Sequence, residues 1–241
     1  MTRRRLLCFL VAASMLAAAC GDEDNGTGPG PGPNPGPVPG PDGGVVRLRV
    51  VHADAHGSSL DVLVDDAQVL TDLPYGTASG YLELDSGSHH VAFVNTSGTI
   101  SDLNMDFADS TAYTVIPCCT QFPLPYTLLT DGDGEPAAGN ARIRVVDFAS
   151  AAPDVDIYVT APGADLAAAT PTATIHITYA SDYIEVPAGD HQVRITPSGS
   201  KTMLADSGTL TLGAGQSHTA IAVDAAGGGE PYGFLVLEDL D

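Results

Sequence analysis

One stretch decides the fold of this chain: Val46–Val51, which reads VRLRVV, recurs as Ala141–Val146, which reads ARIRVV. In the first copy Val46, Leu48 and Val50 alternate with Arg47 and Arg49, and this period of two is typical of a strand that buries one face. A stretch that recurs about a hundred residues later indicates an internal repeat, and a repeat sets the number of domains.

The similarity extends outward from this stretch in both copies. The sequence LDVLV at Leu60–Val64 matches VDIYV at Val155–Val159, at the same offset as the first pair. Motifs that keep their order and nearly keep their spacing indicate a duplication. The further matches, which follow a short insertion in the second copy, are Ala78–Leu84 with Ala180–Val186, Gly87–His89 with Gly189–His191, and Pro125-Tyr126 with Pro231-Tyr232.

The sequence between these motifs is that of β-sheet and turns. Trp is absent, Lys occurs once, and turn signals such as Asp85–Gly87 and Pro187–Gly189 separate the alternating runs. About seven short strands in about 90 residues predict an all-β chain with two tandem antiparallel β-sandwich domains, immunoglobulin-like or similar. A small closed barrel is the alternative architecture. No helix longer than a turn is expected, and the best helical candidate is Ala164–Ala169, in the insertion of the second copy.

The N-terminus has the features of an export signal. Arg3, Arg4 and Arg5 precede an apolar run, Leu6–Ala19, which is shorter than the roughly 20 residues that a membrane span needs. The run ends in small residues before Cys20, and this resembles the lipobox of bacterial lipoproteins, in which the cysteine is acylated. Leu16 lies four residues before the cysteine instead of three, so an ordinary cleaved signal peptide is the alternative, and a twin-arginine signal is a further export route.

The segment after Cys20 predicts a spacer. Nine of the 24 residues of 21–44 are Gly and seven are Pro, with no apolar periodicity, so the segment cannot bury enough surface to offset its ordering entropy. A lipid on Cys20 would tether this disordered Gly/Pro linker to a bacterial membrane. We therefore expect an exported protein that is lipid-anchored, most simply to the outer membrane on its periplasmic or surface face.

The charge of the chain limits its partners. The formal charge is −21, and without residues 1–19 the chain has six basic and thirty acidic residues, a formal charge of −24. Such a surface repels nucleic acid, which attracts patches of Lys and Arg, and also repels anionic lipid headgroups. The expected partners are therefore the membrane through the lipid anchor and an envelope protein or glycan, and not nucleic acid.

Together these patterns predict a domain organisation. Residues 1–19 form the lipoprotein signal peptide, and 20–44 hold the lipidated cysteine and the linker. Residues 45–130 form the first β-sandwich repeat, 131–140 a polar linker, and 141–241 the second repeat.

Several motifs of the first copy resemble the bacterial domain of unknown function (DUF) family 4397. They are Val50–Ala53, Leu60–Val62, Leu73–Gly76 and Ala78–Leu84, followed by Gly87. The resemblance covers most of the first copy and is looser in the second, where Ile177–Tyr179 replaces Leu-Pro-Tyr-Gly and Asp147 replaces His52. It implies an exported, often lipid-anchored protein with no assigned activity, and therefore supplies no catalytic residues.

The two cysteines that remain after export and lipidation are adjacent, at Cys118 and Cys119. Their Cα atoms lie about 3.8 Å apart across a trans peptide, which is below the usual disulfide range. In an oxidising compartment we favour a strained vicinal disulfide. Two free thiols and a bridge to a second molecule are the alternatives, and two adjacent cysteines without a second pair are a poor zinc site.

Other recurring polar residues have a structural interpretation. His89 and His191 begin equivalent strands, where packing at the sheet end is favoured over metal binding. The pairs Asp61 with Asp156 and Glu83 with Glu185 recur alongside the arginines, which predicts cross-strand ion pairs with arginine. The segment Asp131–Glu135 has acidic residues but lacks the spacing of a calcium loop, so a solvated linker is favoured.

The chain lacks the common hydrolase, metalloprotease, phosphate-binding and dinucleotide-binding motifs. We therefore predict a non-enzymatic binding or structural module of the cell envelope, with a protein or glycan ligand and no cofactor or bound metal. The alternative is an envelope hydrolase or a metal-dependent enzyme that uses the recurring Asp and His residues.

Overall fold

The computed structural model describes residues 44–117, 126–132 and 134–240. The predicted signal peptide, Cys20 and the cysteine pair Cys118 and Cys119 lie outside these residues. Within the described ranges every regular element is a β-strand, and no helix has the length and apolarity to cross a membrane. The predicted all-β fold class is confirmed.

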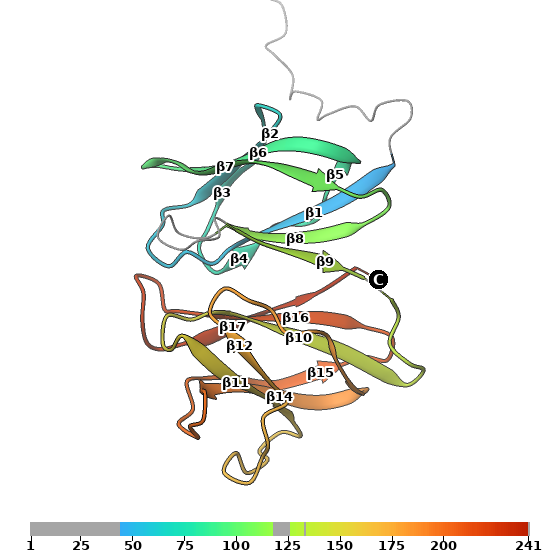
Figure 1. Ribbon diagram of the computed structural model, residues 1–241, viewed down its shortest axis with the longest axis vertical. Coiled ribbons are helices and arrows are strands. Elements are labelled where there is room, and N and C mark those ends of the chain that lie inside the picture. The colour runs from blue at the N-terminus through green and yellow to red at the C-terminus, as the bar shows by residue number, and fades with distance from the viewer. Residues whose placement is uncertain (1–43, 118–125, 133, 241) are drawn as a thin grey trace, which may run out of the picture. The chain divides into compact units, whose positions relative to one another are not determined.

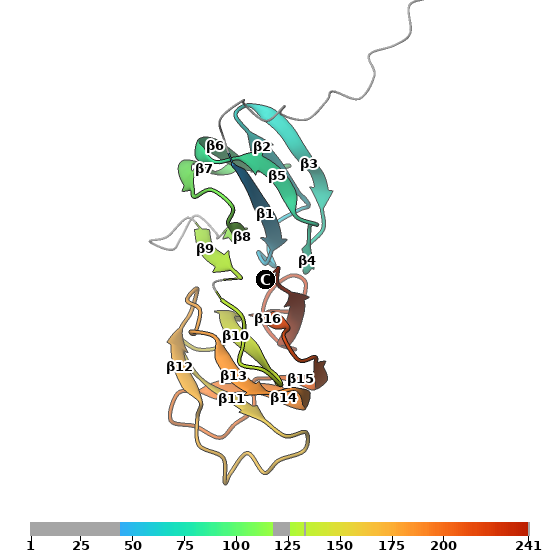
Figure 2. The ribbon, with the colours of Figure 1, turned by 90° about the vertical axis from the view of Figure 1, so that its right-hand side faces the viewer.

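The first repeat is a sandwich of two sheets (Figures 1 and 2). In one sheet the strand order is β4-β1-β8-β9, with β5 also paired to β1, and in the other it is β3-β2-β6-β7. The strands are β1 (Val45–His52), β2 (Leu60–Val64), β3 (Ala67–Leu73), β4 (Thr77–Ala78), β5 (Leu82–Asp85), β6 (Gly87–Asn95), β7 (Gly98–Phe107), β8 (Ala112–Pro117) and β9 (Tyr126–Asp131).

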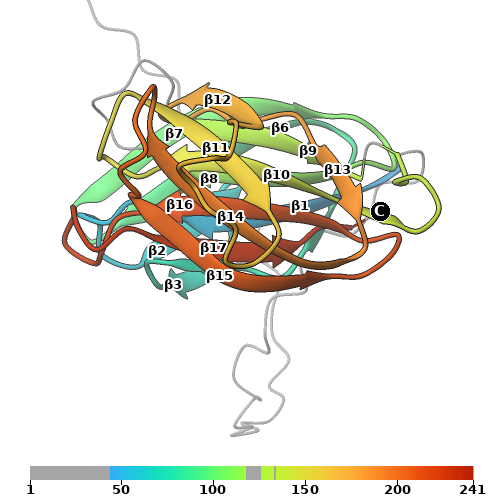
Figure 3. The same cartoon turned by 90° about the horizontal axis from the view of Figure 1, so that it is seen from below.

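The second repeat has the same plan (Figure 3). Its sheets have the orders β13-β10-β16-β17 and β12-β11-β14-β15, and an isolated bridge between Val146 and Ala180 stands where the first repeat has β4. The strands are β10 (Asn140–Phe148), β11 (Asp154–Thr160), β12 (Ala173–His176), β13 (Ile184–Pro187), β14 (Gly189–Pro197), β15 (Ala205–Leu212), β16 (Ser217–Val223) and β17 (Gly233–Glu238).

One strand pair in each repeat is parallel: β1 with β8, and β10 with β16. In a constant-type immunoglobulin domain the first strand lies beside the second, whereas here it lies between the fifth and the eighth. The chain crosses the other sheet between β1 and β8, so both strands start from the same end of the sandwich and pair in parallel. The two-sheet sandwich was predictable, and this strand order was not.

Each sandwich has its own core, built from the inward faces of its alternating strands. Strand β2 follows the predicted alternation, with Leu60, Val62 and Val64 buried. The largest core side chains of the first repeat include Phe93, and those of the second include Ile157 and Ile195. The cores also show why each repeat needs both sheets, since a single sheet would leave one apolar face in water.

The best helical candidate, Ala164–Ala169, forms no helix, in agreement with the expectation that no helix exceeds one turn. The insertion runs as turns, and the Ala169 amide hydrogen shared between the Asp165 and Leu166 carbonyls is its helix-like contact. A single such turn has no amphipathic face to pack, and short isolated helices are unstable in water.

Candidate functional site

Strand β1 departs from the predicted half-buried pattern. From Leu48 to His52 both of its faces are buried, and β10 is buried on both faces over most of its length. The cover is an apolar cluster with members from both repeats, namely Val51, Ala53, Ile116, Leu129, Val146, Ile221 and Val223. The outer face of the β1-β8-β9 sheet therefore packs against the outer face of the β10-β16-β17 sheet.

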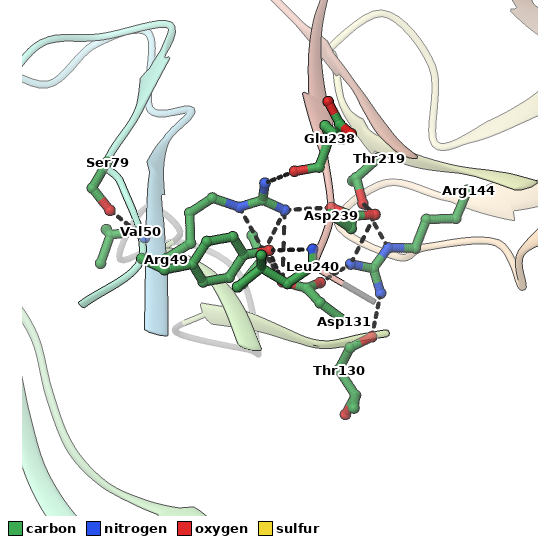
Figure 4. A network of polar contacts seen from close by, with 12 residues as sticks. Arg49, Val50, Ser79, Thr130, Asp131, Arg144, Thr219, Glu238, Asp239 and Leu240 are labelled. Carbon is green, nitrogen blue, oxygen red and sulfur yellow. Dashed lines mark hydrogen bonds and ion pairs between the residues drawn. The ribbon is translucent and has the colours of Figure 1, made fainter. Parts of the chain in front are cut away.

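Beside this cluster Arg49 reaches from the first repeat into the second (Figure 4). Its side chain is 4% exposed. Nη1 donates to the Glu238 carbonyl at 2.8 Å, and Nη2 donates to Oδ1 of Asp239. Within its own repeat Nε donates to Oγ1 of Thr114 at 3.0 Å. One guanidinium thus joins three partners, two of them across the repeat boundary.

Arg144 makes the same contacts in the opposite direction (Figure 4). Nη1 donates to the Thr130 carbonyl at 2.7 Å, and Nη2 donates to Oδ1 of Asp131. Nε donates to Oγ1 of Thr219 at 2.8 Å in its own repeat. We call this reciprocal network the clasp; its residues are Arg49, Tyr81, Thr114 and Asp131 from the first repeat and Arg144, Tyr183, Thr219 and Asp239 from the second.

The second oxygen of each clasp carboxylate is also occupied. Oδ2 of Asp131 accepts from Thr114 Oγ1 at 2.6 Å and from the Tyr81 hydroxyl at 2.7 Å. Oδ2 of Asp239 accepts from its own repeat in the same way, from Thr219 at 2.7 Å and Tyr183 at 2.8 Å.

The clasp tyrosines also contact the arginines. The Arg49 guanidinium lies 4.8 Å from the ring centroid of Tyr81, and that of Arg144 lies 4.7 Å from Tyr183. Burial raises the pKa of both tyrosine hydroxyls, with the adjacent carboxylates acting in the same direction. Each buried guanidinium therefore has hydrogen-bond acceptors and a tyrosine ring beside it, and each buried carboxylate accepts hydrogen bonds at both oxygens. A buried ion pair is tolerated under this condition.

The clasp corrects two predictions. Arg49 and Arg144 pair with Asp131 and Asp239 instead of with the recurring acids, whereas the exposed Arg47 lies 3.8 Å from its cross-strand neighbour Glu83, as predicted. Asp131, predicted to begin a solvated linker, is 3% exposed. Asp131 is the last residue of β9 and lies on the sheet face that packs against the second repeat, which shields the carboxylate from water.

Among the residues that the structure describes, no arginine pairs with Asp61 or Asp156, so the predicted ion pairs of these two acids are wrong. Oδ1 of Asp61 accepts from the Asp72 amide at 2.8 Å. Asp156 accepts from Thr174 Oγ1 at 2.7 Å and from the Gly199 amide at 2.8 Å. Burial would raise the pKa of Asp156, but these hydrogen bonds prevail and lower it. Asp61 therefore bonds the neighbouring strand β3, and Asp156 bonds β12 and the turn after β14, each within its own repeat.

The two recurring histidines lie at sheet ends, as predicted. Nε2 of His89 contacts the Asp85 carbonyl at 2.9 Å, and Nε2 of His191 contacts the equivalent Pro187 carbonyl at 2.7 Å. His89 also packs on Phe107. In the ranges that the structure describes, no group of three or more His, Cys, Asp or Glu side chains is arranged to hold a metal.

The insertion of the second repeat is held by two cations that the sequence did not single out. Arg194 Nη1 donates to the Ala164 carbonyl at 2.8 Å. Lys201 Nζ donates to the Ala169 carbonyl and to the Tyr158 hydroxyl, and lies 4.4 Å from the centre of that ring. The only lysine of the chain thus fixes a loop that the first repeat lacks.

We expect Lys201→Ala to loosen this loop without unfolding the protein. A charge-assisted hydrogen bond contributes about 1.5 kcal/mol, so the amides of Ala169 and Thr172 should exchange with solvent about ten times faster. Hydrogen–deuterium exchange measures this. Arg47→Ala, which removes an exposed cation from the other repeat, is the control; equal exchange rates in both variants would contradict the assignment.

A cavity of about 120 Å³ lies at the junction of the repeats. Oδ1 of Asp224, at its wall, accepts from the Ser150 amide at 2.7 Å. The lining residues are Ala53, Asp54, Ala55, His56, Pro117, Phe148, Ser150, Ile177, Thr178 and Asp224.

Asp147 lies on β10 next to the cavity residue Phe148 and is fully buried. Its Oδ1 accepts from the Ala149 amide at 3.0 Å, while Oδ2 has no hydrogen-bond partner among the described residues. Burial raises the pKa of this carboxyl to about 7, and the charge of Asp224 adds to the increase. His52, which the sequence aligned with Asp147, is equally buried and contacts the Leu73 carbonyl at 3.0 Å.

No curated protein matches this chain in sequence. A solved structure from Bacteroides fragilis, described as a "putative cell adhesion protein", matches with 10% sequence identity over 80% of this chain and 97% of the other, with a TM-score of 0.20, which is too low to indicate a shared fold. Residues 46–158, which span the first repeat and the second as far as β11, match the model of the family "Domain of unknown function (DUF4397)".

Proposed function

We propose that this protein is an exported, lipid-anchored module of the bacterial cell envelope that binds or supports other envelope components without catalysing a reaction. The clasp is the observation that carries the proposal. Arg49 and Arg144, which the sequence marks as recurring polar residues, are used together with Asp131 and Asp239 to join the two sandwiches. These four buried charged side chains thus serve to hold the two repeats together.

A joint of this kind suits a protein that presents a surface. Buried ion pairs and an apolar cluster hold the two repeats in one arrangement, and a preorganised surface loses less entropy when it binds. The Gly/Pro-rich segment before Gly44 would carry that surface away from the headgroups. The ligand class that fits a strongly acidic chain in this location is an envelope protein or a glycan.

The anchor is tested by Cys20→Ser. The variant should lose acyl labelling and leave the membrane fraction, because the thiol that carries the lipid is gone. Cys8→Ser, which changes the other cysteine of the N-terminal segment, should keep both properties. Unchanged labelling or unchanged membrane attachment of Cys20→Ser would contradict the anchor.

The binding role is tested with residues 45–241 as soluble bait in envelope extracts. A stoichiometric partner should be retained, and treating the extract with protease or periodate then separates a protein ligand from a glycan. Asp131→Ala bait, with an opened clasp, is the control and should retain less. Hydrolysis of an envelope component by the purified bait would favour an enzyme instead.

A further inference from the structure

We propose that the docking face of each repeat is a homotypic interaction surface, whose fitting partner is a second copy of the same repeat. In the native chain the two faces occupy each other. When the two faces of one chain cannot pair with each other, each face should pair with the same face of a second chain.

The reciprocity of the clasp carries this proposal. Arg49 binds the carboxylate of Asp239 and the carbonyl before it, and Arg144 binds the carboxylate of Asp131 and the carbonyl before it. Each face therefore offers one arginine and one carboxylate, and receives the same pair in return. A contact in which residue i meets j while j meets i is the mark of a twofold, isologous interface.

Both charged groups of a face lie side by side on one repeat. Nη2 of Arg49 lies 3.6 Å from Oδ2 of Asp131 in the same repeat. A second copy of the first repeat, turned by a twofold rotation, would therefore present Asp131 to Arg49 where Asp239 now lies. Charge complementarity is preserved twice in such a pair.

The apolar part of the face repeats as well. The strand registers align β1 with β10, β8 with β16 and β9 with β17, and three apolar positions of the face of the first repeat have apolar counterparts on the face of the second. Because the two faces carry equivalent apolar residues, a face that packs against the other repeat should also pack against a second copy of itself. The counterparts are Val51 and Val146, Ile116 and Ile221, and Leu129 and Leu237.

Contacts that have no symmetric counterpart among the described residues favour closure within one chain. The Tyr75 hydroxyl donates to the Asp224 carbonyl at 2.7 Å, and Thr127 Oγ1 donates to the Thr178 carbonyl at 2.7 Å. The short connection between β9 and β10 also keeps the partner face at an effective concentration of about a millimolar. The native chain should therefore be a monomer at ordinary concentrations.

Charge inversion in the second repeat alone separates the two kinds of pairing. In the full chain with Arg144→Asp and Asp239→Arg, the contacts within one chain bring like charges together. Two first repeats still offer Arg49 to Asp131, and two second repeats offer the inverted pair to each other. We expect this variant to double its mass to a dimer in sedimentation or light-scattering measurements.

The matched control has the same number of inversions. With Arg49→Asp and Asp239→Arg, both contacts within the chain stay complementary, whereas a homotypic pair of either repeat brings like charges together. This control should remain a monomer. If the control folds as a monomer and the Arg144→Asp/Asp239→Arg variant is a monomer or unfolds, the proposal is overturned.

A second measurement needs no buried inversion. The native chain is refolded from urea at concentrations that rise toward a millimolar, where pairing between chains competes with closure. The dimer fraction should rise with concentration in the native chain. Refolding to monomer alone at every concentration would overturn the proposal, whichever way the charge variants behave.

Discussion

Asp131→Ala should lower the free energy of unfolding by about 3–5 kcal/mol, the cost of leaving a buried charge without its partner. The substitution removes the carboxylate that Arg144 binds, while that guanidinium stays 5% exposed under the other repeat. It also removes the acceptor of Thr114 and Tyr81. Urea denaturation at pH 7, followed by circular dichroism because the chain lacks Trp, measures the effect.

Two variants control this measurement. Asp106→Ala removes an exposed carboxylate from β7 and should change stability by less than about 0.5 kcal/mol. Asp131→Ala combined with Arg144→Met removes both charges and should recover part of the loss, since an apolar pair needs no ionic partner. A loss in Asp131→Ala no greater than in Asp106→Ala would show that the clasp contributes nothing to stability.

Asp147→Asn should stabilise the protein at pH 8 by an amount on the order of 4 kcal/mol, and much less near pH 4. The carboxyl is buried with one oxygen unpartnered, and its pKa is about 7. An amide keeps the acceptor for the Ala149 hydrogen bond but never ionises. Urea denaturation at a series of pH values compares the variant with the native chain.

The direction of this pH dependence follows from the number of protons that Asp147 binds in the folded and the unfolded state. Because the folded pKa of Asp147 lies above 3.8, the ordinary value of an Asp carboxyl, between about pH 4 and 7 the folded state keeps a proton that the unfolded state has lost. The contribution of this group to stability is therefore complete below pH 4 and is lost as pH rises through 7. Asp66→Asn, at a carboxyl that is 96% exposed, should shift nothing; parallel curves for Asp147→Asn and the native chain would contradict the assignment.

The repeat and the sandwich could be read from the sequence because they rest on local patterns. Both patterns depend only on residues that are close in the sequence. They are the alternation of Leu60, Val62 and Val64 and the turns after Asp85 and Pro187. Equivalent histidines at the sheet ends follow from the same alignment of the two copies.

The clasp could not be predicted in this way, because a residue that is buried by another domain has the same local sequence pattern as a residue that faces solvent. Arg49 alternates with apolar residues as a solvent-facing arginine would, and Asp131 lies in a run of acidic and glycine residues that resembles a linker. Asp239 is two residues from the end of the chain. A signal did exist, since Tyr81 and Tyr183 recur at equivalent positions, but only the docked repeats show what they serve.

The covalent connection between the repeats has a consequence for abundance. An interface that forms between separate molecules dissolves on dilution, so its occupancy depends on how many copies a cell makes. The clasp closes inside a single polypeptide, and its closure is a first-order process that dilution does not reverse. A protein present at a few copies per cell would therefore still carry its two sandwiches fully joined.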